Sequence, residues 1–318
     1  MRPLLDLARQ GNCMTDWIVL IAGVVCAGLG GEFFVRGSVG LARWLRVAPG
    51  IIGATVAAFS TSSPELSVSV NAAVTGNSQI ALGDALGSNV VNVALILGLA
   101  LVISAIRSPR DTLRRDFPVA LLVPVATALF LIDGVLSRID GILMLAGFLA
   151  WLVVTIVHAK AQRSAVSEVL SDRGKWLAVL WCGLGLPLLV LAGILIVSGA
   201  RGIAATLGVA PFVIGTTIVA VGTSVPELAT TIIAKIRGHD EIGLGTVLGS
   251  NIFNGLLIVA VAAIIRPIHV NVHDVSVALA FGFVALLFAL PSRSGVIRRL
   301  RGALLLLLYA GYIAAVTL

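Results

Sequence analysis

Ten apolar stretches follow one another along the chain, separated by short segments that carry charge, Gly or Pro. A helix needs about 20 mainly apolar residues to cross a bilayer, and each stretch is close to that length. The stretches lie near 17–41, 50–74, 79–104, 117–133, 138–158, 176–200, 211–235, 241–265, 273–290 and 300–317. The pattern therefore predicts an all-α membrane protein with ten transmembrane helices.

Composition excludes the soluble classes. Of the 318 residues, 58% are hydrophobic and 12% charged, and mean hydropathy is +1.08. An ordinary soluble domain carries about 25% charged residues. The first apolar run continues to about Leu41 with no small-residue cleavage site, so we expect a retained helix rather than a signal peptide. No nucleotide-binding loop, catalytic triad or metal motif lies outside the apolar stretches, so we expect neither an enzyme nor a cofactor.

The basic residues predict the orientation. Of the 22 Lys and Arg residues, 17 lie in loops that follow odd-numbered stretches. The five on the opposite side are Arg2, Arg9, Arg138, Arg201 and Arg266. Basic loops stay in the cytoplasm, so both termini should lie outside, which requires an even number of helices. The net charge of +7 therefore reflects membrane topology and does not indicate nucleic-acid binding. We expect a multi-pass protein of the cell (inner) membrane.

One polar interruption divides the chain into two halves. Residues 160–175 form the longest polar segment and follow the fifth apolar stretch. We expect an N-terminal five-helix half over 1–159, a central cytoplasmic loop over 160–175 and a C-terminal five-helix half over 176–318. None of the loops is long enough to hold a soluble domain.

Each half contains one copy of an internal repeat. VAPGIIGATVAAFSTSSPEL (47–66) matches VAPFVIGTTIVAVGTSVPEL (209–228), and LGDALGSNVVN (82–92) matches LGTVLGSNIFN (244–254). The offset stays at 162 throughout, and about half of the 50 aligned pairs from 47 to 96 are identical. Such self-similarity identifies the architecture before any single motif does. The repeats extend over about 47–104 and about 209–265.

The two copies should enter the membrane from opposite sides, because each half has an odd number of helices. Inverted repeats of this kind are typical of secondary transporters, whose binding site lies at the midplane between the copies. Duplication of a stable helical hairpin is the simpler alternative. It does not explain why the most similar stretches are also the most polar.

The repeats place an acid in the middle of an apolar stretch. Glu65 and Glu227 each follow a proline, Pro64 or Pro226. An acid inside the membrane costs at least a few kcal/mol, which makes it a candidate functional residue. Proline also frees backbone carbonyls, which are tolerated at that depth only beside protein or a polar cavity. Carboxylates, hydroxyls and free carbonyls together predict a cation site within broken helices. Oxygen ligands of these kinds are the ones that Ca²⁺ prefers.

The third and eighth stretches add polar side chains to this site. Ser88 and Asn92 are four residues apart, as are Ser250 and Asn254, so each pair shares a helical face. The neighbouring glycines, which allow close helix packing, are Gly83, Gly87, Gly245 and Gly249. The alternative is that these Ser and Asn side chains only bond neighbouring helices. The site contains no His or Cys, which argues against zinc or copper, and no basic residue, which argues against an anion.

At these residues the sequence resembles the sodium/calcium exchanger family of the cation/calcium antiporter superfamily, in a compact prokaryote-like form. The motifs that carry the resemblance run from Ser60 to Glu65, Gly222 to Glu227, Gly87 to Asn92 and Gly249 to Asn254. They occur as two correctly ordered pairs, and the repeats cover about a third of the chain. The resemblance implies a membrane antiporter in which Na⁺ entering drives Ca²⁺ the other way, both ions being transported substrates.

By position, the resemblance implies that Glu65 and Glu227 are the central metal ligands, shared by both ions. It implies further cation-binding groups, which are Thr61, Ser62, Thr223, Ser224, Ser88, Asn92, Ser250, Asn254 and the carbonyls of Ala58 and Ala220. The first and sixth helices would be the pair that slides to alternate access.

Three features depart from the family pattern. Ser60 replaces the usual Gly before Thr61, and Asn254 stands where some relatives carry Asp. Asp84 is acidic where the second copy has Thr246, so it is either a third acid near the pathway or a residue at a helix start.

Two other functions stay open. An H⁺- or K⁺-coupled divalent cation antiporter would use the same fold, although the G-N-x-x-E pattern of proton-coupled exchangers is absent. A cation channel or a scaffold is the second alternative, but channels bind weakly enough for rapid release, and two carboxylates hold one divalent ion tightly.

Overall fold

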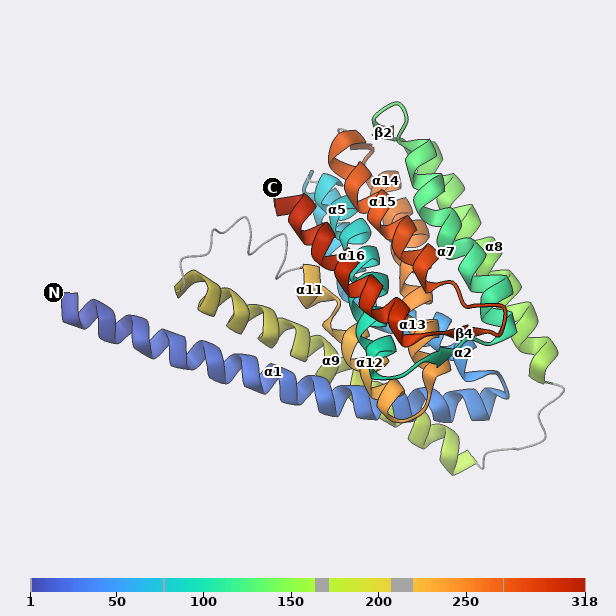
Figure 1. Ribbon diagram of the computed structural model, residues 1–318, viewed down its shortest axis with the longest axis horizontal. Coiled ribbons are helices and arrows are strands. Elements are labelled where there is room, and N and C mark those ends of the chain that lie inside the picture. Colours follow the sequence, from blue (N-terminus) through green and yellow to red (C-terminus); the bar gives the residue numbers. More distant parts are fainter. Residues whose placement is uncertain (1, 77, 164–171, 207–219, 271, 318) are drawn as a thin grey trace.

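The computed structural model describes residues 2–76, 78–163, 172–206, 220–270 and 272–317, which are almost entirely helical (Figure 1). The N-terminal half contains α1 (Arg2–Leu45), α2 (Pro49–Ile52), η1 (Gly53–Ala57), α3 (Ala58–Thr61), α4 (Ser63–Val74), α5 (Ser78–Val90), η2 (Val91–Leu97), α6 (Gly98–Ile103), β1 (Ile106–Arg107), α7 (Arg110–Phe130), β2 (Val135–Leu136) and α8 (Arg138–Arg163). The C-terminal half contains α9 (Asp172–Thr206), α11 (Ala220–Thr223), α12 (Val225–Ile236), α13 (Asp240–Ile252), η4 (Phe253–Ile258), α14 (Val259–Ile265), β3 (Ile268–His269), α15 (Val272–Ala289), β4 (Val296–Ile297) and α16 (Arg299–Thr317).

These helices follow the ten predicted stretches. The second stretch is divided into α2, η1, α3 and α4, and the described part of the seventh is divided into α11 and α12. Residues 211–219, which begin the predicted seventh stretch, lie outside the described residues. In the described part of the chain, six helices are long and apolar enough to cross a membrane uninterrupted.

The predicted bounds of the first and fourth helices differ most from the structure. The fourth helix was expected over 117–133, but α7 begins at Arg110 and ends at Phe130, because its charged first turn continues the helix outward from the apolar part. The first helix was expected over 17–41, but α1 has 44 residues and is therefore about 66 Å long. A helix longer than the bilayer is thick accommodates by tilting. In Figure 1, α1 runs beside α9, and both extend away from the bundle that the other helices form.

The two helices of the G-S-N motifs form the centre of the bundle. In both Ser78–Ile103 and Asp240–Ile265, 78% of the most apolar window is buried, against 22% in α8. Small side chains allow this packing. A Cβ on Gly249 would lie 2.4 Å from the Ala54 carbonyl oxygen, and one on Gly53 would lie 2.5 Å from the Ile242 carbonyl oxygen. Close helix packing is therefore confirmed at Gly249. By the same symmetry, Gly83 and Gly87 would pack against a segment of the second repeat that lies outside the described residues.

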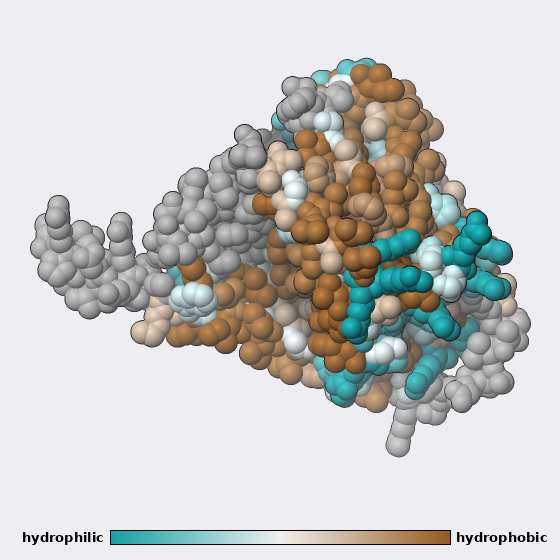
Figure 2. Space-filling model, viewed as in Figure 1, coloured by the Kyte–Doolittle hydropathy of each residue, from teal (hydrophilic) through white to brown (hydrophobic). Residues whose placement is uncertain are grey.

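The loops gather at two opposite ends, as the predicted topology requires. At the odd-loop end, β1 pairs with β4, and one cavity of 830 Å³ is lined by loops that follow the first, third, seventh and ninth helices. At the even-loop end, β2 pairs with β3, and Ser78 Oγ donates to the Pro267 carbonyl at 3.3 Å. Figure 2 shows apolar side chains over most of the visible face and hydrophilic ones gathered near β4 and the start of α16.

A pseudo-two-fold axis relates the two halves and passes between two asparagines. Asn89 Nδ2 donates to the Asn251 carbonyl at 3.3 Å, and Asn251 Nδ2 donates to the Asn89 carbonyl at 3.2 Å. The two residues are 162 positions apart, so each bonds its own equivalent. The strand pairs obey the same symmetry, because exchanging the halves converts β1·β4 into β3·β2. The first Asn of each G-S-N motif therefore joins the repeats.

We expect Asn89→Ala to destabilise the fold. Hydrogen bonds between membrane helices contribute about 1 kcal/mol each, so the midpoint of thermal unfolding in detergent should fall by a few degrees. Asn89→Ala with Asn251→Ala should cost about the sum of the two single changes, because each Nδ2 bonds a backbone carbonyl that the other substitution leaves in place. Asn71→Ala, at an exposed position, is the control. A double change that costs no more than one single change would contradict two separate bonds between the repeats.

Candidate functional site

Both helices that carry a glutamate are broken immediately before it. The backbone leaves the helix at Ser62 (φ −87°, ψ 8°) and at Ser224 (φ −85°, ψ 8°). Pro64 and Pro226 then occupy the first turn of α4 and α12, where a missing amide proton costs nothing. In the first copy, Ser63 Oγ donates to the Ser60 carbonyl at 2.8 Å and replaces the donor that Pro64 lacks. The predicted broken helices are therefore present in both halves.

The asparagines of the third and eighth helices lie in π-helical segments. Asn92 is the second residue of η2, and Asn254 is the second residue of η4. A π-helical turn contains an extra residue, so it shifts the side chains that follow relative to those before, and such turns are frequent at functional sites. The same irregularity at equivalent positions in both repeats marks a preserved feature of the site rather than local disorder of one helix.

Residues of both halves meet at Glu227. Ser62 Oγ donates to Glu227 Oε1 at 3.1 Å and lies 3.0 Å from Ser250 Oγ, while Ser250 Oγ lies 3.3 Å from the same carboxylate oxygen. The broken helix of the first half therefore contacts the acid of the second. The converse holds for Thr223, whose side chain bonds the Glu65 carboxyl. The two carboxyls are also near enough to interact electrostatically.

The predicted site residues form one buried, oxygen-rich cluster. Glu65 and Glu227 are each 1% exposed, and Thr61, Ser62, Ser88, Asn92, Ser224, Ser250 and Asn254 are buried as well. Several of these oxygens have no hydrogen-bond partner. They are Oε2 of both glutamates, Oγ of Ser88 and Ser224, and Oδ1 of Asn92 and Asn254. Buried polar atoms normally find a partner, because leaving them without one is costly. A cation placed among these oxygens would satisfy them together.

The donor set fits a hard cation. Among the described residues, no three His, Cys, Asp or Glu side chains gather to hold a metal, so two carboxylates with neutral oxygens make up this cluster. The Ala58 carbonyl accepts the Ser62 amide at 2.9 Å, and Thr61 Oγ1 lies 3.4 Å from the same oxygen, so its role as an ion ligand stays a prediction. Ala220 is the first residue of α11, and its equivalent role stays a prediction.

Asp84 lies in the second turn of α5, beyond the helix start. Its Oδ2 is buried without a partner, and its carboxyl interacts electrostatically with Glu65. Thr246, the equivalent in the other half, is fully buried and donates to the Ile242 carbonyl at 2.9 Å. The two halves therefore differ here in charge, with the acid in the first half only.

The motifs did not reveal two further polar side chains near the site. Ser69 and Thr231 each lie four residues after a glutamate, one helical turn away, and are equivalent in the two repeats. Both are buried, and neither Ser69 Oγ nor Thr231 Oγ1 has a partner. Their spacing in both copies is the signal that could have identified them.

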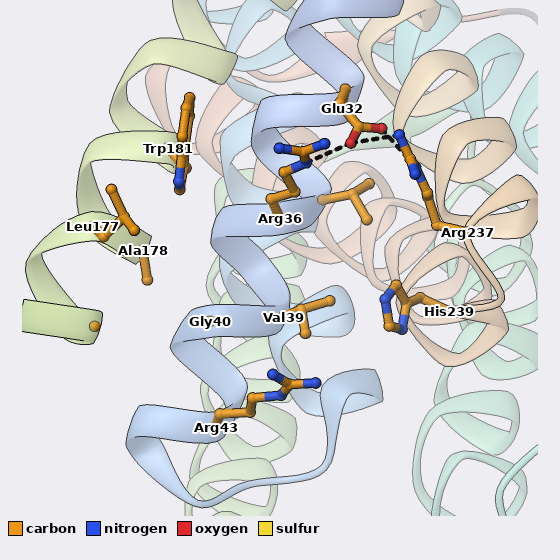
Figure 3. Close-up of a pocket in the computed structure, with 12 residues that line it drawn as sticks. Glu32, Arg36, Val39, Gly40, Arg43, Leu177, Ala178, Trp181, Arg237 and His239 are labelled. Carbon is orange, nitrogen blue, oxygen red and sulfur yellow. Dashed lines mark hydrogen bonds and ion pairs between the residues drawn. The ribbon is translucent and has the colours of Figure 1, made fainter. Parts of the chain in front are cut away.

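A separate polar cavity lies where α1 meets the bundle (Figure 3). It has a volume of 410 Å³, with α1 on one side and Trp181 and Ala178 of α9 on the other. Figure 3 shows the Glu32 carboxylate between two guanidinium groups. Arg36 is on the same helix, whereas Arg237 follows α12 and donates from Nη2 to Glu32 Oε1 at 2.7 Å. This ion pair connects α1 to the helix that carries Glu227.

Two inverted, broken helices with buried carboxylates at their crossing define a class, the secondary transporters of cations. The chain matches the family described as Sodium/calcium exchanger protein over residues 15–157 and again over 177–318. The chain belongs to this family, and its relatives are transporters rather than enzymes.

Named relatives and a solved structure cover nearly the whole chain. It is 37% identical to CaxA of Alkalimonas amylolytica, over 93% of this chain and 96% of that protein. It is 30% identical to the sodium/calcium exchanger MaX1 of Methanosarcina acetivorans, over 94% and 97% of the two chains. A solved structure of the sodium-calcium exchanger NCX_Mj superposes with a TM-score of 0.84 at 31% identity, over 95% of this chain and 99% of that chain. The predicted fold of ten helices in two inverted five-helix repeats is confirmed.

Proposed function

We propose that the protein is a secondary active antiporter that exchanges Na⁺ for Ca²⁺ across the membrane by alternating access. The observation that carries this proposal is the buried cluster around Glu65 and Glu227. It contains one acid from each repeat, together with oxygens that have no protein partner. Family membership supports it. Ca²⁺ and Na⁺ are then transported substrates, and the exchange needs no cofactor.

The site residues divide the work of binding. Glu65 and Glu227 would supply the charge that neutralises one Ca²⁺, and they would also serve Na⁺. The neutral ligands would be the hydroxyls of Thr61, Ser62, Ser88, Thr223, Ser224 and Ser250, the amide oxygens of Asn92 and Asn254, and the carbonyls of Ala58 and Ala220. Six to eight oxygens of these kinds meet the coordination demand of Ca²⁺. Asp84 would be an additional acid on the pathway, because its Oδ2 is buried without a protein partner and its carboxyl interacts with that of Glu65.

Charge explains why transport would be an exchange. Two uncompensated carboxylates in a closed, dry site are costly, so the empty protein should resist the conformational change. A bound cation removes that cost and thereby favours the change through its differential affinity for the states. Since Na⁺ and Ca²⁺ would compete for the same two acids, the return step requires the other ion.

We propose that the protein lies in the cell membrane with both termini outside and with the loop over 160–175 in the cytoplasm between the two five-helix halves. The excess of Lys and Arg in loops after odd-numbered helices supports this orientation. It also explains why the odd-loop cavity is lined by Arg107, Arg110, Arg114 and Arg293.

The test is ⁴⁵Ca²⁺ uptake into proteoliposomes loaded with Na⁺. We expect uptake after dilution into Na⁺-free choline buffer and little uptake into buffer with matched Na⁺, because only the first provides an outward Na⁺ gradient. A protonophore should leave the uptake unchanged. Equal uptake in both buffers would refute sodium coupling, and uptake that collapses with the protonophore would identify a proton as the driving ion.

A further inference from the structure

A groove runs between α7 and α8 on the surface of the bundle, away from the ion site. It has a volume of 610 Å³, and apolar side chains line most of it, among them Val119, Leu122, Phe130 and Leu143. From Arg115 to Phe130 it follows α7 over 15 residues, which correspond to about 22 Å. The groove therefore extends from the odd-loop end past the middle of a hydrocarbon core that is about 30 Å thick.

The groove is open where a side chain could enter it. Gly147 of α8 lines it, and a Cβ built there would meet no described atom within 4 Å. Leu122 is 60% exposed and Leu143 is 53% exposed. Because these residues lie within transmembrane helices, the medium that reaches the groove is the hydrocarbon of the bilayer.

Basic groups stand at one end of the groove. Arg114, Arg115 and His158 line this end, together with one acid, Asp111, which makes an interaction of its own. Arg114 is exposed and bonds none of the residues that the structure describes. His158 has Nδ1 2.9 Å from the Val154 carbonyl, which leaves Nε2 available.

Arg115 is buried and only partly satisfied. Its Nε and Nη2 donate to Asp116 at 2.7 and 2.8 Å, and Trp151 Nε1 donates to the same carboxylate at 3.1 Å. Asp116 is therefore neutralised within the protein. The remaining nitrogen, Arg115 Nη1, is buried and has no partner in the protein. The whole side chain is only 5% exposed. A buried guanidinium favours an anionic acceptor, and phosphate matches its geometry.

We propose that this groove binds one anionic glycerophospholipid, with its phosphate at Arg114 and Arg115 and an acyl chain along the groove toward Phe130. The apolar length, the basic end at headgroup depth and the unpartnered Nη1 each match one part of such a molecule. Basic pockets between transmembrane helices on the cytoplasmic side are known to bind lipid headgroups.

A bound chain would support the helix that carries Asn254. Leu256, a residue of η4, lines the groove, and Trp151 packs edge-on against Phe253 of η4 with ring centroids 6.1 Å apart. A lipid chain in the groove would therefore pack against the side of η4 that faces the groove. The protein should then unfold at a higher temperature when the lipid is bound.

The experiment measures the thermal midpoint of the purified full chain in detergent, with added phosphatidylglycerol or phosphatidylcholine, and counts retained lipid by native mass spectrometry. We expect phosphatidylglycerol to raise the midpoint more. Gly147→Phe should fill the groove and remove most of this shift. Gly183→Phe, on α9, is the matched control, since a Cβ there also meets no described atom within 4 Å.

Headgroup recognition is tested with Arg114→Gln. It should weaken phosphatidylglycerol binding about fivefold, since a basic residue at the membrane surface contributes about 1 kcal/mol. Arg110→Gln, one turn away and outside the groove, should bind as the parent does. An unchanged shift in Gly147→Phe, or equal shifts with both lipids, would overturn the proposal. A shift produced by inorganic phosphate alone would identify a free-anion site and overturn the lipid assignment.

Discussion

Glu65→Gln and Glu227→Gln are each expected to reduce Na⁺-driven Ca²⁺ uptake at least about thirtyfold, because losing one partner of a buried charge interaction costs about 2–5 kcal/mol. Gln keeps the shape of the side chain but removes the charge, so one carboxylate would face a divalent ion alone. Both glutamates are 1% exposed, which leaves no water to compensate. The measurement is initial ⁴⁵Ca²⁺ uptake into Na⁺-loaded proteoliposomes.

The folded state should survive these substitutions. Glu65 Oε2 and Glu227 Oε2 have no partner in the protein, so neutralising either acid removes a desolvated charge that the neighbouring hydroxyls stabilise only in part. We expect unchanged expression and a thermal midpoint equal to or above that of the parent. Asp133→Asn, at an exposed loop acid, controls for loss of charge in general. Exchange at parental rate in either glutamate variant would exclude that residue as a central ligand.

The sequence predicted the features that depend on local chemistry. Apolar length predicted the helices, and Pro64 and Pro226, each next to a buried acid, predicted where two of them break, because proline removes an amide donor and crowds the preceding turn. The constant offset of 162 predicted equivalent roles for Glu65 and Glu227. Their burial then follows from their position in the middle of apolar stretches.

Features that depend on packing between distant segments were not predictable. Ser62 bonds Glu227 across 165 residues, and no pattern in either segment specifies which half supplies the partner. The π-helical turns at Asn92 and Asn254 leave no signal in the periodicity of such apolar segments. Asn89 was part of a recognised motif, yet its bond to Asn251 appears only when the two halves are placed face to face.

Cross-linking α1 to the bundle is expected to stop exchange almost completely. If α1 and α9 slide together past the other helices, any link between α1 and α12 must hold the protein in one state. Glu32 and Arg237 already meet there, with Arg237 Nε 2.8 Å from Glu32 Oε2 (Figure 3). In a chain with Ser at the three native Cys positions, Glu32→Cys with Arg237→Cys would be joined by a short bifunctional methanethiosulfonate, which forms a disulfide with each Cys and releases sulfinate. Reduction should restore ⁴⁵Ca²⁺ uptake.

The control link joins the two helices that should move as one unit. Phe33 of α1 and Trp181 of α9 have ring centroids 4.9 Å apart, so Phe33→Cys with Trp181→Cys allows the same reagent to join α1 to α9. We expect this cross-linked protein to keep most of its exchange activity. If both links stop exchange, α1 and α9 move relative to each other rather than together. If neither does, the sliding of this pair is not the step that alternates access, and motion must lie within the eight-helix bundle.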